Sequence, residues 1–544
     1  MFLHRNAIPA AAIGLSAVLL AGCTSETGGG STGPVNGGTL TYATGDAEPT
    51  CLDPHVGGNY PQALVSAQYL ESLVSLDEAG KVVPWLATEW TTAEDGLSWE
   101  FTLRDDVTFT DGVPLNSEAV AANIAHVQDP ATGSSTGYLA LAKVTGVEAV
   151  SDTVVRLTLS SPDSALLESL SQPWLAIESP TALERDTETN CESPVGTGPF
   201  VVTAWDRQSS ITLERNEDYN SPPADAPEGG PYLDSITWRF VPDSATRYAA
   251  LASGEVDVID NAQPDTIVAG EKDDAIKELD APRPGASNRL ELNSGRPPFD
   301  DQRVREAFIR SAGVDDGITG LFVGTAERSY SALSSVEPLG VSMPELFTYD
   351  PDAANTLLDA AGWSERDVDG YRVKDGTQLT VVFPVSTNQS IPAEQSLFEQ
   401  VQATSKEVGF DVQLQSLDLS SWYGALGANE YDVVSAPYTK VGPDVLRVLF
   451  ASAGITPAPS GYFANHAQVN IPELDELLAK ASEATDVNER EQLYADAQRI
   501  VLEGYYILPL YDQQNHYLYR SDVEGLRAMS TVSTPTFANA WLDR

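Results

Sequence analysis

The chain has 544 residues and a formal net charge of −48, because 79 acidic residues outnumber 31 basic ones. Such a surface repels phosphate groups and excludes nucleic acid as an expected partner. The ~505 residues that follow the N-terminal segment exceed what one hydrophobic core accommodates, so two or more domains are expected.

The first 23 residues predict secretion followed by lipid attachment. Arg5 precedes an apolar run, residues 7–20, which is too short to span a bilayer and is typical of a signal peptide. Residues 20–23, Leu-Ala-Gly-Cys, resemble a bacterial lipobox, in which cleavage leaves Cys23 as the N-terminus and its thiol takes a diacylglycerol. The alternative is a plain signal peptide with an incidental cysteine. We expect residues 1–22 to be the signal peptide and the mature protein to be lipid-anchored on the extracytoplasmic face of the cell membrane.

Residues 23–38 predict a flexible linker behind that anchor. The stretch is rich in Gly, Ser and Thr and has no apolar pattern. A coil of this length reaches about 20 Å, so it lifts a folded body off the membrane without fixing its orientation. No ATP or NADPH is available there, which argues against most metabolic enzymes.

Beyond the linker, short strands and single helices alternate along the chain. β-Branched or alternating runs predict strands at residues 39–43, 99–103, 154–159, 211–214, 256–259, 379–383 and 412–417. Helical spacing of apolar residues predicts helices at 63–76, 245–253, 303–312, 352–361, 394–408, 471–484 and 488–503. Ser117 is expected to cap one further helix. The mixture indicates an α/β architecture with large irregular insertions.

Two cysteines remain once Cys23 is assigned to the lipid. Cys51 and Cys191 are expected to form a disulfide, because the exterior is oxidising and no other thiol is left to pair. Two separately buried thiols are the alternative. Neither residue has the spacing of a metal site, so no metal is expected.

Catalytic motifs are missing from the sequence. It contains no Gly-x-Ser-x-Gly elbow, no His-Glu-x-x-His and no Walker loop. Residues 196–199, Gly-Thr-Gly-Pro, lead into a predicted strand and are interpreted as a turn, not a phosphate loop. The histidines, His4, His55, His126, His466 and His516, are scattered along the chain, where single histidines are usually surface or satisfied groups. We therefore expect neither enzymatic activity nor a cofactor.

Read in order, a series of segments resembles one family. They include Leu-Asp-Pro at 52–54, Lys-Val-Val-Pro-Trp-Leu-Ala at 81–87, and Asp-Gly-Leu-Ser-Trp-Glu-Phe-Thr-Leu-Arg at 95–104 with Phe-Thr-Asp-Gly at 109–112. Gly-Thr-Gly-Pro-Phe at 196–200, Arg-Val-Arg-Glu-Ala-Phe at 303–308 and Ala-Gly-Trp at 361–363 follow. Their order and spacing resemble the family 5 extracellular solute-binding proteins of bacterial ABC importers, the oligopeptide-, dipeptide- and nickel-binding group, over roughly residues 38–525.

The resemblance implies a two-lobed α/β fold of the type II periplasmic-binding-protein kind, with large insertions in the first lobe. Lobe I would comprise residues 39–287, lobe II residues 288–511, and residues 512–544 would return to lobe I. A hinge of two crossover segments is expected near residues 289–293 and 508–511, since two strands that join two lobes can absorb the change of closure.

Peptide-binding relatives hold an extended peptide and anchor its α-amino group on an acidic residue that follows a Tyr-Asp-Val strand. Here that strand is expected at residues 431–433, and the acid would fall near Thr439 or Lys440, where the chain has no carboxylate. Asp444 is the nearest acid and is shifted along the chain. Blocking a peptide's α-amino group is therefore expected to weaken binding little.

Further contact residues are predicted from loop position and chemistry, because aromatic rings with polar tips give rigid, adaptable contact area. Each could equally be part of a lobe core. Together with Asp444, the predicted ligand-binding residues are Tyr60, Asn388, Trp422, Tyr423, Tyr438, Phe463, Asn465 and Tyr511.

The resemblance implies a monomeric substrate-binding lipoprotein that delivers cargo to the permease subunits of an ABC importer. A peptide is the cargo favoured by family frequency. A metal chelate, an oligosaccharide or another small metabolite is the alternative, as is a surface sensor without transport. An extracellular hydrolase would need a nucleophile–base pair, and no such pair is evident in the sequence.

Overall fold

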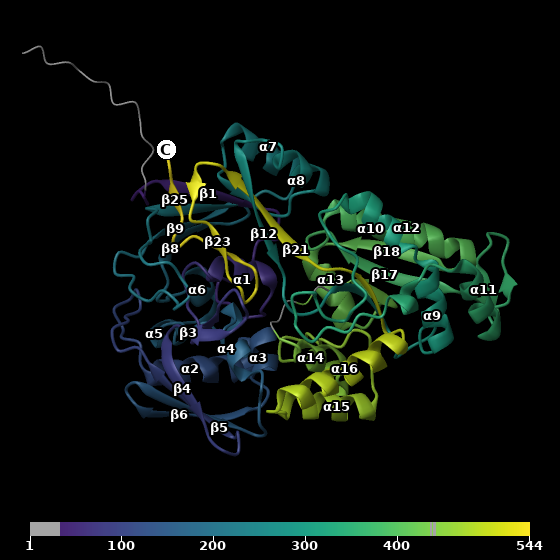
Figure 1. The fold of residues 1–544 in the computed structure, drawn as a ribbon, viewed down its shortest axis with the longest axis horizontal. Helices are drawn as coiled ribbons and strands as arrows, with labels where there is room; N and C mark the ends of the chain where they lie inside the picture. The colour runs from purple at the N-terminus through teal and green to yellow at the C-terminus, as the bar shows by residue number, and fades with distance from the viewer. Residues whose placement is uncertain (1–32, 436–437, 439–441) are drawn as a thin grey trace, which may run out of the picture.

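A computed structural model describes residues 33–435, 438 and 442–544. It consists of two α/β parts placed side by side (Figure 1). Cys23 and the predicted signal peptide lie outside the described residues. In the ranges that are described, no helix has both the length and the apolar character needed to cross a membrane.

A seven-stranded mixed sheet forms the base of the first part. β1 runs parallel to both of its neighbours, β10 and β11, whereas the other pairings are antiparallel. The order across the sheet is β12 (Ile276–Pro282), β21 (Gln514–Arg520), β11 (Val258–Ile259), β1 (Thr39–Thr44), β10 (Ser235–Phe240), β9 (Ser210–Arg215) and β8 (Phe200–Asp206). Because β21 follows the whole second part in sequence, the C-terminal segment returns to the first part, where its yellow ribbon lies among purple and teal elements (Figure 1).

A separate four-stranded antiparallel sheet is inserted in the first part. Its order is β4 (Ala87–Thr92), β5 (Ser98–Leu103), β7 (Val154–Leu159) and β6 (Val144–Ser151). The helix α2 (Ser117–Gln128) packs against β6 and β7 and buries Val120 and Ile124 in the core of this insertion. The insertion thus has its own hydrophobic cluster, as expected for a large irregular addition.

In the described residues, the second part combines three small sheets with a layer of helices, and one of these sheets consists of β14 (Glu365–Arg366), β15 (Arg372–Lys374) and β16 (Thr377–Gln378). The strand β13 (Asn288–Leu292) lies between β19 (Val433–Ser435) and β20 (Ile507–Tyr511), and β17 (Thr380–Ser386) runs parallel to β18 (Asp411–Leu417). The larger helices are α9 (Gln302–Ser311), α10 (Val314–Phe322), α11 (Pro351–Ala360), α12 (Pro392–Val408), α13 (Leu419–Gly427), α15 (Pro472–Glu483) and α16 (Val487–Glu503). Except for those of α13, their buried side chains belong to one cluster drawn from residues 286–511.

The chain passes between the two parts at two neighbouring links. Residues 283–287 connect β12 to β13, and residues 512–513 connect β20 back to β21. The backbone N–H of Arg283 donates to the carbonyl of Gln513 at 2.9 Å, so the two links lie side by side. The segments expected as crossovers, 289–293 and 508–511, are mainly the paired strands β13 and β20, and the passage itself falls just outside them.

Most predicted strands and helices are present within one or two residues, including β1, β5, β7, α7 (Ser244–Ser253) and α12. The helix predicted at 63–76 is wrong beyond its first turn: α1 (Tyr60–Ser66) ends early and β2 (Val74–Leu76) follows. The reason is a long-range pairing, since the carbonyls of Gln68 and Tyr69 accept from Phe200 and Gly198. The cap of α2 is Asn116, one residue before the predicted Ser117.

Candidate ligand-binding site

A cavity of about 520 Å³ lies where the two parts of the chain face each other. Its volume falls in the range of roughly 300–1,000 Å³ that is typical of small-molecule sites. The first part contributes residues between 46 and 174 together with Arg283, and the second part contributes residues between 389 and 463. A ligand in this cavity would therefore touch both parts at once.

Two consecutive glycines bring the main chain to the cavity wall just before α1. Gly57 and Gly58 have φ angles of +74° and +101°, a region that other residues rarely adopt. A Cβ atom on Gly58 would also meet Ser135 and Thr136 at 3.3 Å. The glycines thus allow a tight turn whose backbone borders the cavity against a second loop.

Aromatic side chains form much of the remaining wall. Tyr423 on α13 and Tyr462 meet edge to face, with ring centroids 6.1 Å apart. Trp174 is fixed by its indole N–H, which donates to the carbonyl of Asn59 at 3.1 Å. Such rings supply rigid apolar contact area at low entropic cost. The aromatic lining residues are Tyr60, Trp174, Tyr423, Tyr438, Tyr462 and Phe463.

Among the described lining residues, Arg283 is the basic one and Asp46 the acidic one. The Arg283 guanidinium lies over the ring of Tyr60, with 3.9 Å from its central carbon to the ring centroid. Burial, together with nearby Asp260, raises the pKa of Asp46 to about 7, and Arg283 acts in the opposite direction. Asp46 is therefore partly protonated near neutral pH.

Two polar atoms of the lining are buried without a hydrogen-bond partner among the described residues. They are the hydroxyl of Tyr438 and Oε1 of Gln389. A buried polar group left unpaired costs about 1–3 kcal/mol, so a ligand that supplies the missing partner recovers part of that energy. The cavity is therefore suited to a ligand that is apolar over most of its surface and polar at a few positions.

Five of the nine predicted contact residues lie at cavities. Tyr60, Tyr423, Tyr438 and Phe463 line the large cavity. Tyr511 lines a smaller one of about 80 Å³, which adjoins the first because both include Asp46, Tyr60, Arg283 and Gln389.

The other four predicted residues line neither of these cavities and have roles inside the protein. Trp422 is 2% exposed and packs in a small hydrophobic cluster. Oδ1 of Asn388 accepts from the backbone N–H of Leu419, and the fully buried Asn465 bonds only to backbone groups. Asp444 is 1% exposed and pairs with an arginine three residues along α14 (Val445–Phe450). Thr439 and Lys440 lie outside the described residues.

Sequence reasoning missed Asp46, Trp174, Arg283, Gln389 and Tyr462 as lining residues. A signal existed for Tyr462, which precedes the predicted Phe463, and for Arg283, which precedes the predicted crossover. Trp174 and Asp46 gave no local signal, because only the packing of distant segments brings them to one wall.

The disulfide predicted between Cys51 and Cys191 is present in the structure, with Cα atoms 4.4 Å apart. Next to it, the backbone N–H of Leu52 donates to the carbonyl of Cys191 at 2.9 Å. The bond ties the loop before α1 to α6 (Thr187–Glu192). It thereby anchors the segment that leads to the cavity turn at 57–58.

Comparison with known proteins places this geometry in context. Residues 81–457 match the family model of the bacterial extracellular solute-binding proteins, family 5. The nickel-binding periplasmic protein of Escherichia coli (strain K12) is 27% identical over 456 residues, which cover 82% of this chain and 83% of that protein. The glutathione-binding protein GsiB of Shigella flexneri is 28% identical over 472 residues, covering 85% of this chain and 86% of that protein.

Solved structures share the fold over nearly the whole chain. The ABC transporter-associated periplasmic binding protein DppA of Helicobacter pylori, in complex with the peptide STSA, has a TM-score of 0.81 at 24% identity and covers 94% of this chain and 99% of its own. NikA of Brucella suis, in complex with Fe(III)-EDTA, has a TM-score of 0.77 at 26% identity, covering 93% and 100%. The expected two-lobed type II periplasmic-binding-protein fold is confirmed.

Proposed function

Because this chain belongs to the bacterial extracellular solute-binding proteins of family 5, we propose that it captures a small solute between its lobes and delivers it to the permease of an ABC importer. Lobe I comprises residues 39–287 and 512–544 in this proposal, and lobe II residues 288–511. The protein acts outside the cytoplasm, on a lipid attached to Cys23, and performs no chemical step on its cargo. Its similarity to named binding proteins supports this reading.

The cargo we propose is a small solute with an apolar body and a carboxylate, a short peptide being the first candidate. The observation that carries this proposal is Arg283, a guanidinium in a cavity walled largely by aromatic rings. A guanidinium matches a carboxylate with two parallel hydrogen bonds, which are stronger than bonds between neutral groups. The unpaired atoms of Tyr438 and Gln389 provide sites for the peptide groups or other polar atoms of the same solute.

A nickel chelate is the second candidate, favoured by the similarity to the nickel-binding periplasmic protein. Within the described lining there is no His, Cys or Met side chain, so the cavity offers few ligands for a bare metal ion. A chelate whose carboxylates face outward would still meet Arg283. Native mass spectrometry of the purified protein separates the candidates, because the mass of a co-purified peptide and that of a metal complex differ.

Calorimetry with the identified cargo tests the role of Arg283. Arg283→Gln should weaken binding about 10- to 100-fold, the loss expected when a charge-assisted hydrogen bond of ~1.5–3 kcal/mol is removed. Arg499→Gln is the matched control, because Arg499 forms a surface ion pair on α16. Equal affinity of Arg283→Gln and the wild type would exclude carboxylate recognition by Arg283.

If the cargo is a peptide, an N-acetylated form of it tests the missing amino anchor. Acetylation should change the binding free energy by less than ~2 kcal/mol, the energy of a lost charge-assisted bond, because Asp444 is already paired inside the protein. A larger loss would show that Asp46, the acidic residue of the described lining, binds the amino group of the peptide.

Solution scattering should also show a smaller radius of gyration with cargo, since cargo that contacts both lobes favours the closed state.

A further inference from the structure

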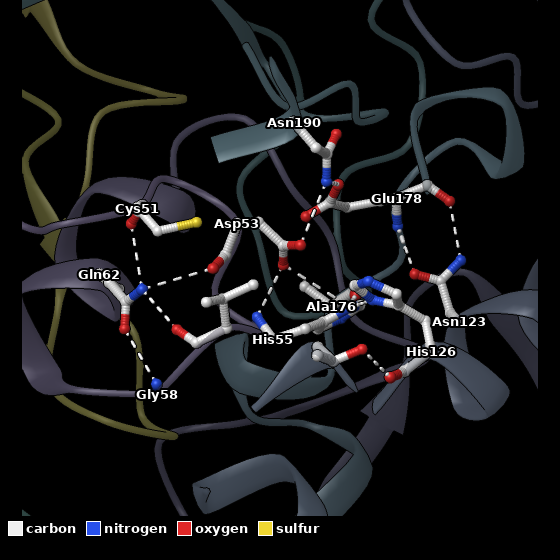
Figure 2. Close-up of polar contacts among 12 residues, drawn as sticks. Cys51, Asp53, His55, Gly58, Gln62, Asn123, His126, Ala176, Glu178 and Asn190 are labelled. Atoms are coloured by element: carbon white, nitrogen blue, oxygen red, sulfur yellow. Dashed lines mark hydrogen bonds and ion pairs between the residues drawn. The ribbon is translucent and has the colours of Figure 1, made fainter. Parts of the chain in front are cut away.

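Figure 2 shows a cluster of two histidines and two carboxylates. None of these four residues lines the large cavity. Asp53 and His55 come from the loop before α1, and His126 comes from the last turn of α2. Glu178 follows the short helix η2 (Pro173–Leu175). In the part of the chain that the structure describes, Asp53, His55 and His126 form one group whose donor atoms all lie within 4.8 Å of one another.

The hydrogen bonds of His55 leave one of its ring nitrogens directed at His126. His55 Nε2 lies 2.9 Å from the carbonyl oxygen of Ala176, and a carbonyl only accepts, so Nε2 carries the proton. In the neutral imidazole, His55 Nδ1 then carries the lone pair. It faces Nδ1 of His126 at 3.1 Å, as Figure 2 shows, and His126 Nδ1–H donates to it in the metal-free arrangement.

A backbone carbonyl that holds the distal N–H is the usual support of a metal-binding imidazole, because it fixes both the tautomer and the ring orientation. The separation of the two Nδ1 atoms also suits a shared ion. With metal–nitrogen bonds of about 2.05 Å, a separation of 3.1 Å gives an angle of about 100° at the metal, close to tetrahedral.

Asp53 supplies the third donor. Its Oδ1 lies 3.7 Å from His55 Nδ1 and accepts from the backbone N–H of His55 at 2.8 Å. Its Oδ2 accepts from Nδ2 of Asn190 at 3.1 Å, and the same Nδ2 donates to Oε2 of Glu178 at 2.9 Å. The two carboxylates thus lie next to each other and share one amide (Figure 2).

Glu178 provides a second, independent observation at this cluster. The residue is fully buried, and its Oε1 has no hydrogen-bond partner among the described residues. Two buried carboxyl groups beside two imidazoles are stabilised by a divalent cation, which neutralises the charge that burial disfavours.

We propose that Asp53, His55 and His126 bind a divalent transition-metal ion, with zinc as the first candidate. Two imidazoles and one carboxylate are ligands of the borderline kind that zinc prefers, and Asn190, whose amide donates to both Asp53 and Glu178, orients the Asp53 carboxylate. This ion is structural and is not cargo, since none of its three ligands lines the cavity. His126 is half-buried, which gives an ion a route from the surface.

The consequence of the site is a fixed cavity wall. Gly57 and Gly58, which are separated from His55 by Val56, border the cavity, and the backbone N–H of Ser135 donates to the carbonyl of Gly57 at 2.8 Å. A metal that joins His55 to α2 links this loop to the helix beside it. The ion therefore holds the turn at 57–58 in the position that closes one side of the cavity.

Titration of the chelator-treated protein with Zn²⁺, in competition with a chromophoric chelator, tests the proposal. One ion per chain should bind with micromolar or tighter affinity, and zinc should raise the melting temperature. Asp53→Asn and His126→Gln should each weaken zinc at least tenfold. Asp53→Asn preserves the size of the side chain, and His126 is only half-buried, so both variants are expected to fold. His516→Gln is the matched control, because His516 also contacts carboxylates, Glu278 and Asp280, yet forms no three-ligand group with other described residues.

X-ray absorption of the wild-type zinc complex provides a readout that does not depend on any variant. It should show two imidazole ligands and a short zinc–oxygen distance. The absence of a one-to-one site in the wild type would overturn the proposal. So would equal zinc affinity in all three variants, or an absorption spectrum with fewer than two imidazoles, since zinc would then be bound elsewhere on this acidic surface.

Discussion

Glu71 gives the chain a pH dependence of stability whose size follows from its surroundings. The side chain is fully buried behind α1, and its carboxyl accepts from Trp85 Nε1 at 2.9 Å and from Thr197 Oγ1 at 2.7 Å. Burial outweighs these bonds and the bond from Ser221, and it raises the pKa of Glu71 from 4.5 to about 7. The folded chain therefore binds a proton between pH 4.5 and pH 7 that the unfolded chain has already released.

The sign follows from proton linkage. A raised pKa in the folded state means that the stability contribution is fully present below about pH 4.5 and is lost as the pH rises through about 7. At about 1.36 kcal/mol for each pKa unit, a shift from 4.5 to about 7 corresponds to ~3 kcal/mol in total. Of this amount, ~2.5 kcal/mol falls between pH 5 and pH 8.

Glu71→Gln removes this titration while keeping the size of the side chain, and the hydroxyl partners can accept from the amide as well as donate to it. Urea denaturation at pH 5 and pH 8 should show that the wild type loses ~2.5 kcal/mol more than the variant over this interval. Glu78→Gln, at an exposed position after β2, is the control and should behave as the wild type. If Glu71→Gln and the wild type lost the same free energy between the two pH values, the reasoning would be refuted.

Three further predictions concern the disulfide, lipid attachment at Cys23 and the cavity wall. Non-reducing peptide mapping should recover Cys51 and Cys191 in one crosslinked peptide, and two freely alkylated thiols in the native sample would contradict the disulfide. Reduction should destabilise the protein by up to ~5 kcal/mol, since the bond spans 140 residues. Cys23→Ala should lose labelling by an alkyne fatty acid, and equal labelling of the variant would exclude lipidation at that residue. Trp422→Ala should cost ~3–5 kcal/mol of stability with little change in cargo affinity, because Trp422 lies in the core. Tyr423→Ala should mainly weaken cargo binding, because Tyr423 lines the cavity. The reverse pattern in denaturation and calorimetry would show the assignment to be wrong.

Local pattern was sufficient for most of the secondary structure and for the fold class. Strands such as β18 and helices such as α12 follow from periodicity, because one face of each is buried in the core of its lobe. The helix predicted at 63–76 failed where the apolar pattern continues but the backbone carbonyls of residues 68 and 69 pair with the segment 198–200. A partner more than a hundred residues away leaves no mark on local spacing.

The binding site was less accessible to such reasoning. Trp422 and Tyr423 are adjacent aromatic residues on one helix, and a rotation of about 100° per residue sends one into the core and the other to the cavity. Nothing in their residue types distinguishes them. His55 and His126 illustrate the same limit, because each looks like an isolated histidine until the fold brings their Nδ1 atoms to 3.1 Å.

The position of Arg283 connects the cavity to the motion expected of two lobes. Arg283 begins the first link between the parts, and its backbone N–H donates a hydrogen bond to the carbonyl of Gln513 in the second link. A group held by both links changes position less during closure than a group at the rim of either lobe. We infer that a cargo carboxylate engages Arg283 first, and that the rings of the second part, among them Tyr423 and Tyr462, complete the cavity as the lobes close. Closure would then be driven by contacts that the open form lacks, since a ligand shifts an equilibrium only by its difference in affinity for the two states.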